Sequence, residues 1–165
     1  MKPDAFKNHI EKAHKQWLCD NLLLCANHQW VDLHTSMFGG DEIYFELKCR
    51  LRRRKNESWC VREDQINEYR EVYGDDNVYW MFLIYTLDRE IVSIKNFVGK
   101  KIVSRDLFIL PWQFVDRYPI YEAKHAYPRE ADFPKMKGTW INGTLIRYPD
   151  RRIKKFLDTV KEIPF

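Results

Sequence analysis

Apolar residues recur at helical spacing near the start of the chain and at alternating spacing in the segments that follow. A helix over about residues 4–22 is predicted from apolar residues at three- and four-residue steps, namely Phe6, Ile10, Ala13, Trp17 and Leu18. Residues 30–38 and 43–52 alternate between apolar and polar types, as half-buried β-strands do. The Gly-rich sequence between these two runs predicts a hairpin.

The same alternation predicts how the two strands pair. A three-residue loop over residues 39–41 places Leu33 opposite Leu47, and Asp32 opposite Lys48 and diagonal to Glu46. A two-residue turn would instead place Asp32 opposite Leu47 and mix polar with apolar faces. We therefore expect the three-residue loop, which gathers the three charged residues on one face of the sheet.

The pattern further along predicts a helix, a central strand and a closing helix. Residues 61–73 bring Val61, Gln65, Tyr69 and Val72 to one side of a helix that ends at Gly74. Residues 78–87 are almost all apolar, which indicates a strand covered on both faces. Beyond residue 88 we expect strand pieces near residues 91–94 and 107–110, an irregular stretch over residues 111–140, and a helix over about residues 150–163.

Composition narrows the class of protein. With 165 residues the chain fits a single α/β domain. Lys and Arg exceed Asp and Glu by 28 − 24 = 4, and six of the eight residues 48–55 are basic. This run suits a polyanion, although a solvated basic strand end is the alternative. The candidate phosphate contacts are Arg50, Arg52, Arg53, Arg54 and Lys55.

The cysteines and the apolar segments indicate the compartment. The four cysteines form no Cys-x-x-Cys pair, so we expect reduced, intracellular thiols. A zinc set of Cys19, Cys25 and His28 lacks the paired spacing of structural zinc sites. No window approaches the ~18 apolar residues of a membrane span. We expect a cytoplasmic protein of prokaryotic or viral origin with no membrane partner.

The hairpin sequence itself invites a nucleotide-cyclase interpretation. Residues 39–43, "GGDEI", differ by one residue from the Gly-Gly-Asp-Glu-Phe box of diguanylate cyclases. Only 38 residues precede this box, and they supply no strand carrying a metal-binding Asp ahead of the first helix. Gly-Gly-Asp also suits a tight hairpin loop for local reasons. A cyclic-dinucleotide synthase therefore stays a third and more distant alternative.

A second motif agrees better with the element order. Asp32, followed after thirteen residues by Glu46-x-Lys48 on the paired strand, resembles the PD-(D/E)xK nuclease superfamily. This superfamily includes many restriction enzymes and Holliday junction resolvases, and the resemblance covers about residues 4–87. Val31 replaces the family's proline. The resemblance implies a three-layer, restriction-endonuclease-like core with a central mixed sheet flanked by helices.

The resemblance also implies a chemistry and a set of site residues. Asp32 and Glu46 would hold Mg²⁺, with Mn²⁺ as a substitute, while Lys48 orients or deprotonates the attacking water. An ordinary surface ion pair is the alternative for these groups. Gln65 on the next helix matches a glutamine that faces such sites, and Glu11 matches an additional acidic metal residue.

The expected function is a Mg²⁺-dependent DNA endonuclease acting as a homodimer, since one site cuts one strand. A catalytically silent nucleic-acid-binding protein is the alternative. With residues 4–87 as the nuclease core, residues 88–165 would form an irregular extension that contributes substrate recognition. It combines aromatic and basic side chains as nucleic-acid surfaces do, although core residues and a solvated helix are an equal alternative; they are Trp112, Trp140, Arg147, Tyr148, Arg151 and Arg152. His34 shares the Asp32 face and is a further candidate for phosphate or metal contact.

Overall fold

The computed structural model describes residues 3–26, 31–38, 41–53, 58–88, 101–122 and 124–163. Three α-helices are present, α1 (Pro3–Leu22), α2 (Glu63–Tyr73) and α3 (Arg151–Glu162). The longer strands are β1 (Leu33–Phe38), β2 (Asp41–Leu51), β4 (Val78–Leu87), β5 (Ile102–Pro111), β7 (Lys137–Ile141) and β8 (Thr144–Tyr148). Shorter elements are β3 (Val61–Arg62), β6 (His125–Ala126), and the 3₁₀ segments η1 (Asp75–Asn77), η3 (Trp112–Arg117) and η4 (Glu130–Asp132).

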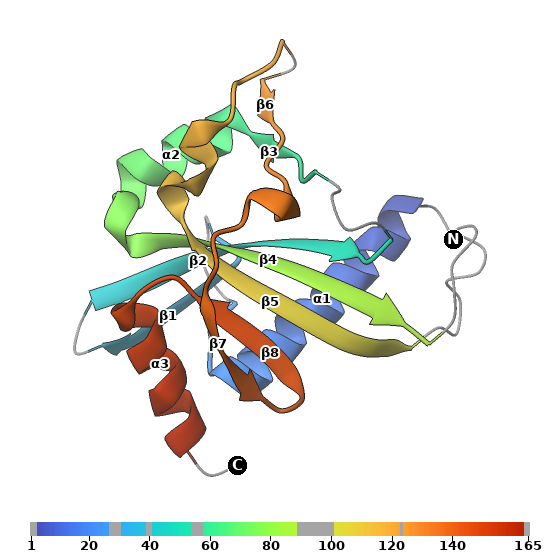
Figure 1. Ribbon diagram of the computed structural model, residues 1–165, viewed down its shortest axis with the longest axis vertical. Helices are drawn as coiled ribbons and strands as arrows, with labels where there is room; N and C mark the ends of the chain where they lie inside the picture. Colours follow the sequence, from blue (N-terminus) through green and yellow to red (C-terminus); the bar gives the residue numbers. More distant parts are fainter. Residues whose placement is uncertain are drawn as a thin grey trace.

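A six-stranded mixed sheet in the order β1-β2-β4-β5-β8-β7 runs through the protein (Figure 1). The β2–β4 and β5–β8 pairs are parallel, and the other pairs in this sheet are antiparallel. The first eight residues of β4 are all buried, which confirms the prediction of a central strand covered on both faces. The α/β class with a mixed sheet is confirmed with it.

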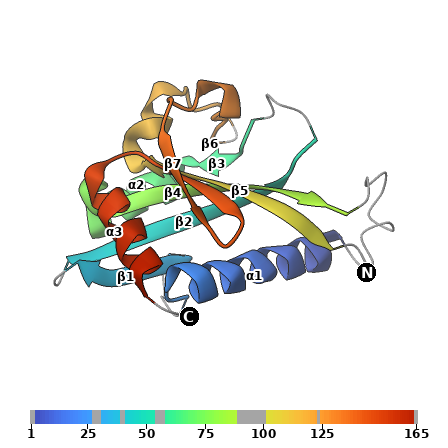
Figure 2. The ribbon, with the colours of Figure 1, turned by 60° about the horizontal axis from the view of Figure 1, so that its bottom comes forward.

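Helices cover the sheet on opposite faces (Figure 2). Leu18 and Leu22 of α1 and Phe156 of α3 pack on one face. Ile66 and Tyr69 of α2, together with η3, pack on the other face. Because successive residues of β4 point to opposite faces, the strand contributes to both cores.

The face under α2 and η3 contains a stacked pair of tryptophans. Trp80 of β4 and Trp112 of η3 are fully buried, with ring centroids 3.8 Å apart and planes only 4° from parallel. Each indole N–H donates to a backbone carbonyl, from Trp80 to Trp112 and from Trp112 to Ile66. The prediction that Trp112 meets DNA is therefore wrong.

The register of the first hairpin differs from the predicted one. Leu33 pairs with Phe45 rather than Leu47, and Phe38 pairs with Asp41, so only residues 39 and 40 separate the paired ends. An irregularity between Thr35 and Phe38 takes up the odd residue, as a β-bulge does. From Leu33 to Thr35 the register therefore shifts by two residues, which keeps the paired side chains there on their predicted faces.

Several other boundaries also depend on contacts that are distant in sequence. Val61 belongs to β3, where it pairs with Ala126, so the helix begins at Glu63. Val72 is 56% exposed and does not pack on the sheet, whereas Tyr69 does. The strand expected near residues 107–110 is the second half of β5, and the strand expected near residues 91–94 lies outside the described residues.

The irregular stretch predicted up to residue 140 ends earlier, in a hairpin that adds two strands to the sheet. Asn142 and Gly143 connect β7 to β8 with positive φ angles of 46° and 81°. Asn-Gly is the sequence that two-residue hairpin turns of this kind prefer. The closing helix α3 follows as predicted, with the Asp150 carboxylate accepting a hydrogen bond from the Ile153 backbone N–H.

A buried histidine joins α1 to the sheet. His14 packs against the Tyr85 ring at 4.6 Å between centroids, and its Nδ1 accepts a hydrogen bond of 3.0 Å from Arg105 Nε. Burial, helped by the positive charge of Arg105, lowers the pKa of His14 from 6.5 to about 3. The imidazole is therefore neutral in the folded protein.

This neutral histidine should make the fold sensitive to acid. The unfolded chain binds a proton at His14 below about pH 6.5 and the folded protein does so only near pH 3, so stability falls between these values. In urea unfolding at pH 7 and pH 4, followed by circular dichroism, His14→Gln should lose on the order of 2 kcal/mol less than the wild type. Equal losses for the two proteins would contradict the assignment.

Candidate active site

Two carboxyl groups from adjacent strands meet where the first hairpin opens. Asp32 directly precedes β1, and the pairing of Leu33 with Phe45 brings it beside Glu46 rather than Lys48. Burial raises the pKa of Glu46, and the two carboxyl groups lie close enough for the negative charge of Asp32 to raise it further. Asp32 Oδ2 also accepts a hydrogen bond of 2.9 Å from the Leu47 backbone N–H, which fixes the carboxylate at the edge of β2.

Glu46 was expected on an outward face, but its side chain is only 7% exposed because α2 covers this part of the sheet. Gln65 Nε2 donates to Glu46 Oε1 at 2.7 Å, and the Tyr69 hydroxyl donates to Oε2 at 3.3 Å. Lys48 follows two residues later on the same face, with Nζ 3.8 Å from Glu46 Oε1. The structure thus brings together Asp32, Glu46, Lys48 and Gln65.

Burial and charge change the protonation of this pair. Burial, together with the negative charge of Asp32, raises the pKa of Glu46 from 4.5 to about 8, although Lys48 opposes the shift. A raised pKa is what two carboxyl groups that share one site produce, because both cannot ionise without a compensating cation. Near neutral pH the Glu46 carboxyl group therefore keeps its proton.

The first helix contributes a cation as well as an acid. Lys15 Nζ lies 2.7 Å from Asp32 Oδ1, and Glu11 lies one helical turn earlier at 3.8 Å from the same ammonium group. Burial alone would lower the pKa of Lys15, but the hydrogen bond and negative charge of Asp32 raise it, with help from Glu11 and Glu46. The Lys15 ammonium group therefore links Glu11 to Asp32.

A cleft of about 340 Å³ opens beside these groups along β2. Its walls include Glu11, Glu46, Lys48, Arg50, Trp59 and Tyr85. Within the described residues, β1 pairs with β2 only as far as Phe45, so the cleft follows the part of β2 that extends past β1. A strand residue directs its N–H and C=O to the same side, so the Leu47 carbonyl also faces the edge where Asp32 accepts the Leu47 N–H.

Two buried polar atoms beside the cleft have no hydrogen-bond partner among the described residues. They are Gln65 Oε1, an acceptor next to Glu46, and Trp59 Nε1, a donor on the cleft wall. Native proteins satisfy nearly all buried polar atoms with protein or ordered solvent. An acceptor and a donor of this kind suit a bound water and a phosphate oxygen.

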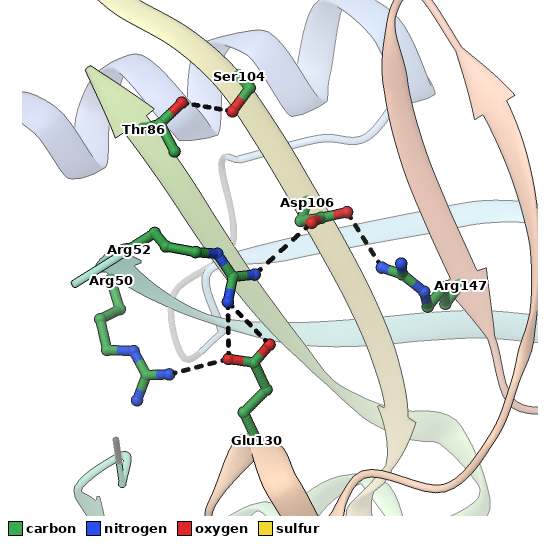
Figure 3. A network of polar contacts seen from close by, with 7 residues as sticks. All are labelled: Arg50, Arg52, Thr86, Ser104, Asp106, Glu130 and Arg147. Atoms are coloured by element: carbon green, nitrogen blue, oxygen red, sulfur yellow. Dashed lines mark hydrogen bonds and ion pairs between the residues drawn. The ribbon is translucent and has the colours of Figure 1, made fainter. Parts of the chain in front are cut away.

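The predicted basic run is partly neutralised by acids from the second half of the chain (Figure 3). Arg52 Nη1 lies 3.1 Å from both carboxylate oxygens of Glu130, and Arg50 Nη2 lies 3.4 Å from Oε1. Arg52 also pairs with Asp106 at 3.6 Å, and Arg147 pairs with the other oxygen of Asp106 at 3.0 Å. Arg50 and Arg147 further stack on Trp59 and Phe108.

The remaining predicted residues are distributed over the protein. Arg53 is exposed, while Arg54 and Lys55 lie outside the described residues. His34 is hydrogen-bonded to Glu42. Of the aromatic and basic residues beyond residue 88, Trp140 is 65% exposed and Arg151 is exposed, whereas Arg152 is bonded to Asp76 O and Asn77.

Three residues of the site were missed by sequence reasoning, and two of them, Lys15 and Tyr69, had a partial signal. Lys15 follows Glu11 by one helical turn, so it shares the face from which Glu11 was expected to reach the site. Tyr69 follows Gln65 at the same interval. Glu130 had no local signal, because its partners Arg50 and Arg52 lie about 80 residues earlier in the chain.

Among the described residues, no three His, Cys, Asp or Glu side chains form a group that could hold a metal ion by themselves. None of the described helices has the length and apolar character needed to cross a lipid bilayer. No protein-family model matches the chain, and no curated protein or solved structure shows significant similarity to it. Functional inference therefore depends on the site itself.

Replacing the buried acid should stabilise the protein at alkaline pH. Because the folded pKa of Glu46 lies above its unfolded value, the stability that its proton provides is lost as pH rises from about 4.5 through 8. In urea unfolding with EDTA, Glu46→Gln should exceed the wild type by on the order of 2 kcal/mol at pH 8.5 and match it near pH 5. If the difference in unfolding free energy between the two proteins did not change with pH, Glu46 would not be protonated in the folded protein.

Proposed function

We propose that this protein is a Mg²⁺-dependent DNA endonuclease with a restriction-endonuclease-like core of the PD-(D/E)xK type. The observation that carries the proposal is the meeting of Asp32 and Glu46 on adjacent strands, with Lys48 on the same face and Gln65 bonded to Glu46. The parallel β2–β4 pair with α2 between them in sequence agrees with the expected core. A cyclic-dinucleotide synthase has no comparable support.

The donor set suits Mg²⁺. Asp32, Glu46 and the Leu47 carbonyl would hold the ion, because Mg²⁺ in nucleases is bound by one or two carboxylates and completes its shell with water and phosphate. A buried carboxyl group whose pKa is raised beside a second carboxylate is an arrangement that a divalent ion would stabilise in the ionised form. The unpartnered acceptor Gln65 Oε1 is available to a water at the same place.

The protein residues then divide the catalytic work. Mg²⁺ supplies charge neutralisation at the phosphate and an activated water. Lys48, 3.8 Å from Glu46, orients that water or takes its proton and stabilises negative charge that develops on the phosphate. Gln65 and Tyr69 fix the Glu46 carboxylate.

DNA is the proposed substrate, and a homodimer the proposed working form, because one such site cuts one strand. Lys48 and Arg50 lie two residues apart on one face of β2, and Arg52 directly follows its last residue, so the phosphates that flank the scissile bond would lie along that face. Asp106 and Glu130 leave this region only a moderate positive charge. Moderate charge suits an enzyme that must release its product.

A catalytically silent nucleic-acid-binding protein is the second candidate, and the observation that favours it is Lys15. Its ammonium already provides a cation 2.7 Å from Asp32, where a metal ion would otherwise compensate the carboxylate. In such a protein Lys15 and the neighbouring hydrogen bonds would hold the two carboxyl groups in place, and no metal ion would bind to them. DNA binding without cleavage, and without any Mg²⁺ binding measured by calorimetry, would favour this candidate.

Cleavage should depend on both Mg²⁺ and the predicted residues. Incubated with supercoiled plasmid, branched DNA or single-stranded DNA, the wild type should cut in Mg²⁺ and not in EDTA. Glu46→Gln and Lys48→Ala should each reduce the rate by at least about 100-fold, because each removes a group needed for metal or water activation.

The matched control is Lys154→Ala on the exposed face of α3, which should cut as the wild type does. Binding of Lys48→Ala to DNA, measured by fluorescence anisotropy, should stay within about threefold of the wild type. Paired cuts rather than nicks in the plasmid would support the homodimer. Cleavage that survives both substitutions would place the active site elsewhere.

Releasing the arginines from Glu130 should strengthen DNA binding. In Glu130→Gln the side chains of Arg50 and Arg52 lose their ion pairs with Glu130, while Arg52 keeps its pair with Asp106, so more of their positive charge is left for phosphates. We expect higher affinity and a plot of log affinity against log salt that is steeper by about one unit. Asp158→Asn, which changes the net charge equally on α3, should leave the slope unchanged. Unchanged slope in Glu130→Gln would show that these arginines do not meet DNA.

A further inference from the structure

An aromatic groove of about 460 Å³ lies next to the cleft, on the segment that links η3 to η4. It is lined by Ser58, Tyr118, Pro119, Tyr121, Tyr127 and Arg129. Tyr121 is 56% exposed and Tyr127 is 38% exposed, with ring centroids 5.7 Å apart. A cluster of exposed aromatic rings indicates a binding surface.

Hydrogen bonds support the backbone beside the groove. Tyr121 and Lys124 close a tight turn through hydrogen bonds from Tyr121 N to His125 O and from Lys124 N to Tyr121 O. The Tyr118 hydroxyl donates to Asp132 at 2.7 Å, and Arg129 Nε donates to the same carboxylate at 3.1 Å. These hydrogen bonds support the backbone around the exposed Tyr121 and Tyr127 rings and do not involve those two rings.

The groove continues from the candidate active site. Ser58 lines both the cleft that contains Glu46 and Lys48 and the groove that contains the tyrosines. Backbone pairing of Ser58 with Arg129, and a hydrogen bond from Trp59 N to Pro128 O, fasten the two surfaces together. A strand that leaves the cleft past Ser58 would enter the groove directly.

We propose that this groove stacks the unpaired bases of a DNA strand whose scissile phosphate lies in the cleft, so that the substrate class is DNA with a single-stranded segment at the cut. This inference rests on the proposed nuclease function and makes it more specific. Splayed arms, flaps and branch points have such segments, whereas an intact blunt duplex does not.

The chemistry of the lining favours bases over other occupants. Aromatic side chains stack on the faces of bases without sequence preference, and those faces are accessible only in an unpaired strand. The outside of a duplex presents phosphates and sugars, for which tyrosine rings have little affinity. Among the described lining residues Arg129 carries the charge; it is paired with Asp132 at 3.1 Å, and its side chain is 57% exposed toward the side on which the backbone of the same strand would lie.

Equilibrium binding in EDTA tests the groove without requiring catalysis. The probe is a fluorescent oligo-dT of about 12 nucleotides, compared with an abasic strand of equal length that keeps the phosphates and lacks the bases. The wild type should bind oligo-dT more tightly than the abasic strand. The Tyr121→Ala/Tyr127→Ala double variant should lose about 10- to 100-fold of its oligo-dT affinity, with no change in salt dependence.

Two variants serve as controls. Tyr121→Phe/Tyr127→Phe keeps the rings and should bind oligo-dT within about threefold of the wild type. Val72→Ala shortens an apolar side chain on α2 that is 56% exposed and lies outside the groove lining, and it should also bind as the wild type does. Circular dichroism should show all of these variants to be folded, since the altered side chains are exposed.

Each outcome decides the proposal. Equal affinity of the wild type for oligo-dT and the abasic strand, or unchanged binding in the double alanine variant, would overturn it. So would binding of a proline-rich peptide in the groove in place of oligo-dT. Duplex cleavage without oligo-dT binding would overturn the proposed role of the groove but not the nuclease function. Oligo-dT binding that depends on the groove, without any cleavage, would overturn the nuclease function but not the role of the groove.

Discussion

The cost of burying the Glu46 carboxyl group shapes the whole arrangement around β2. A carboxyl group under a helix and against a sheet must be protonated, paired or hydrogen-bonded. Here the neighbouring elements supply all of these, through Gln65 and Tyr69 of α2, Lys48 of the same strand, and Asp32 at the start of β1. A purely structural core would place an apolar residue at this position, so the polar network argues for a function.

The sequence predicted those features that depend on short-range patterns. The helix α1, the central strand β4 and the closing helix α3 follow from apolar spacing and from the residues that end them. The faces of β1 and β2 were also predicted, whereas the register was wrong. Hydrophobic alternation repeats every two residues, so it cannot distinguish registers that differ by two, and a bulge near Thr35 is invisible to it.

The remaining errors come from partners that are distant in the chain. Arg50 and Arg52 look like free cations in sequence, because nothing near them indicates that Glu130 and Asp106 will pair with them. Trp112 likewise looks like a surface aromatic within a polar, Pro-containing stretch. The candidate site was better predicted than its surroundings, since Asp32, Glu46, Lys48 and Gln65 lie within one helix and one hairpin whose faces are set locally.

The buried tryptophans are concentrated on one face of the sheet. Trp59, Trp80 and Trp112 all lie in the core beneath α2 and η3, while the core beneath α1 and α3 contains only the partly buried Trp17 among the described residues. Intrinsic fluorescence therefore reports mainly on one layer of the molecule, the layer that holds Glu46 in place. Loosening of α2 would change the emission spectrum even while α1 and α3 remained packed on the far face of the sheet.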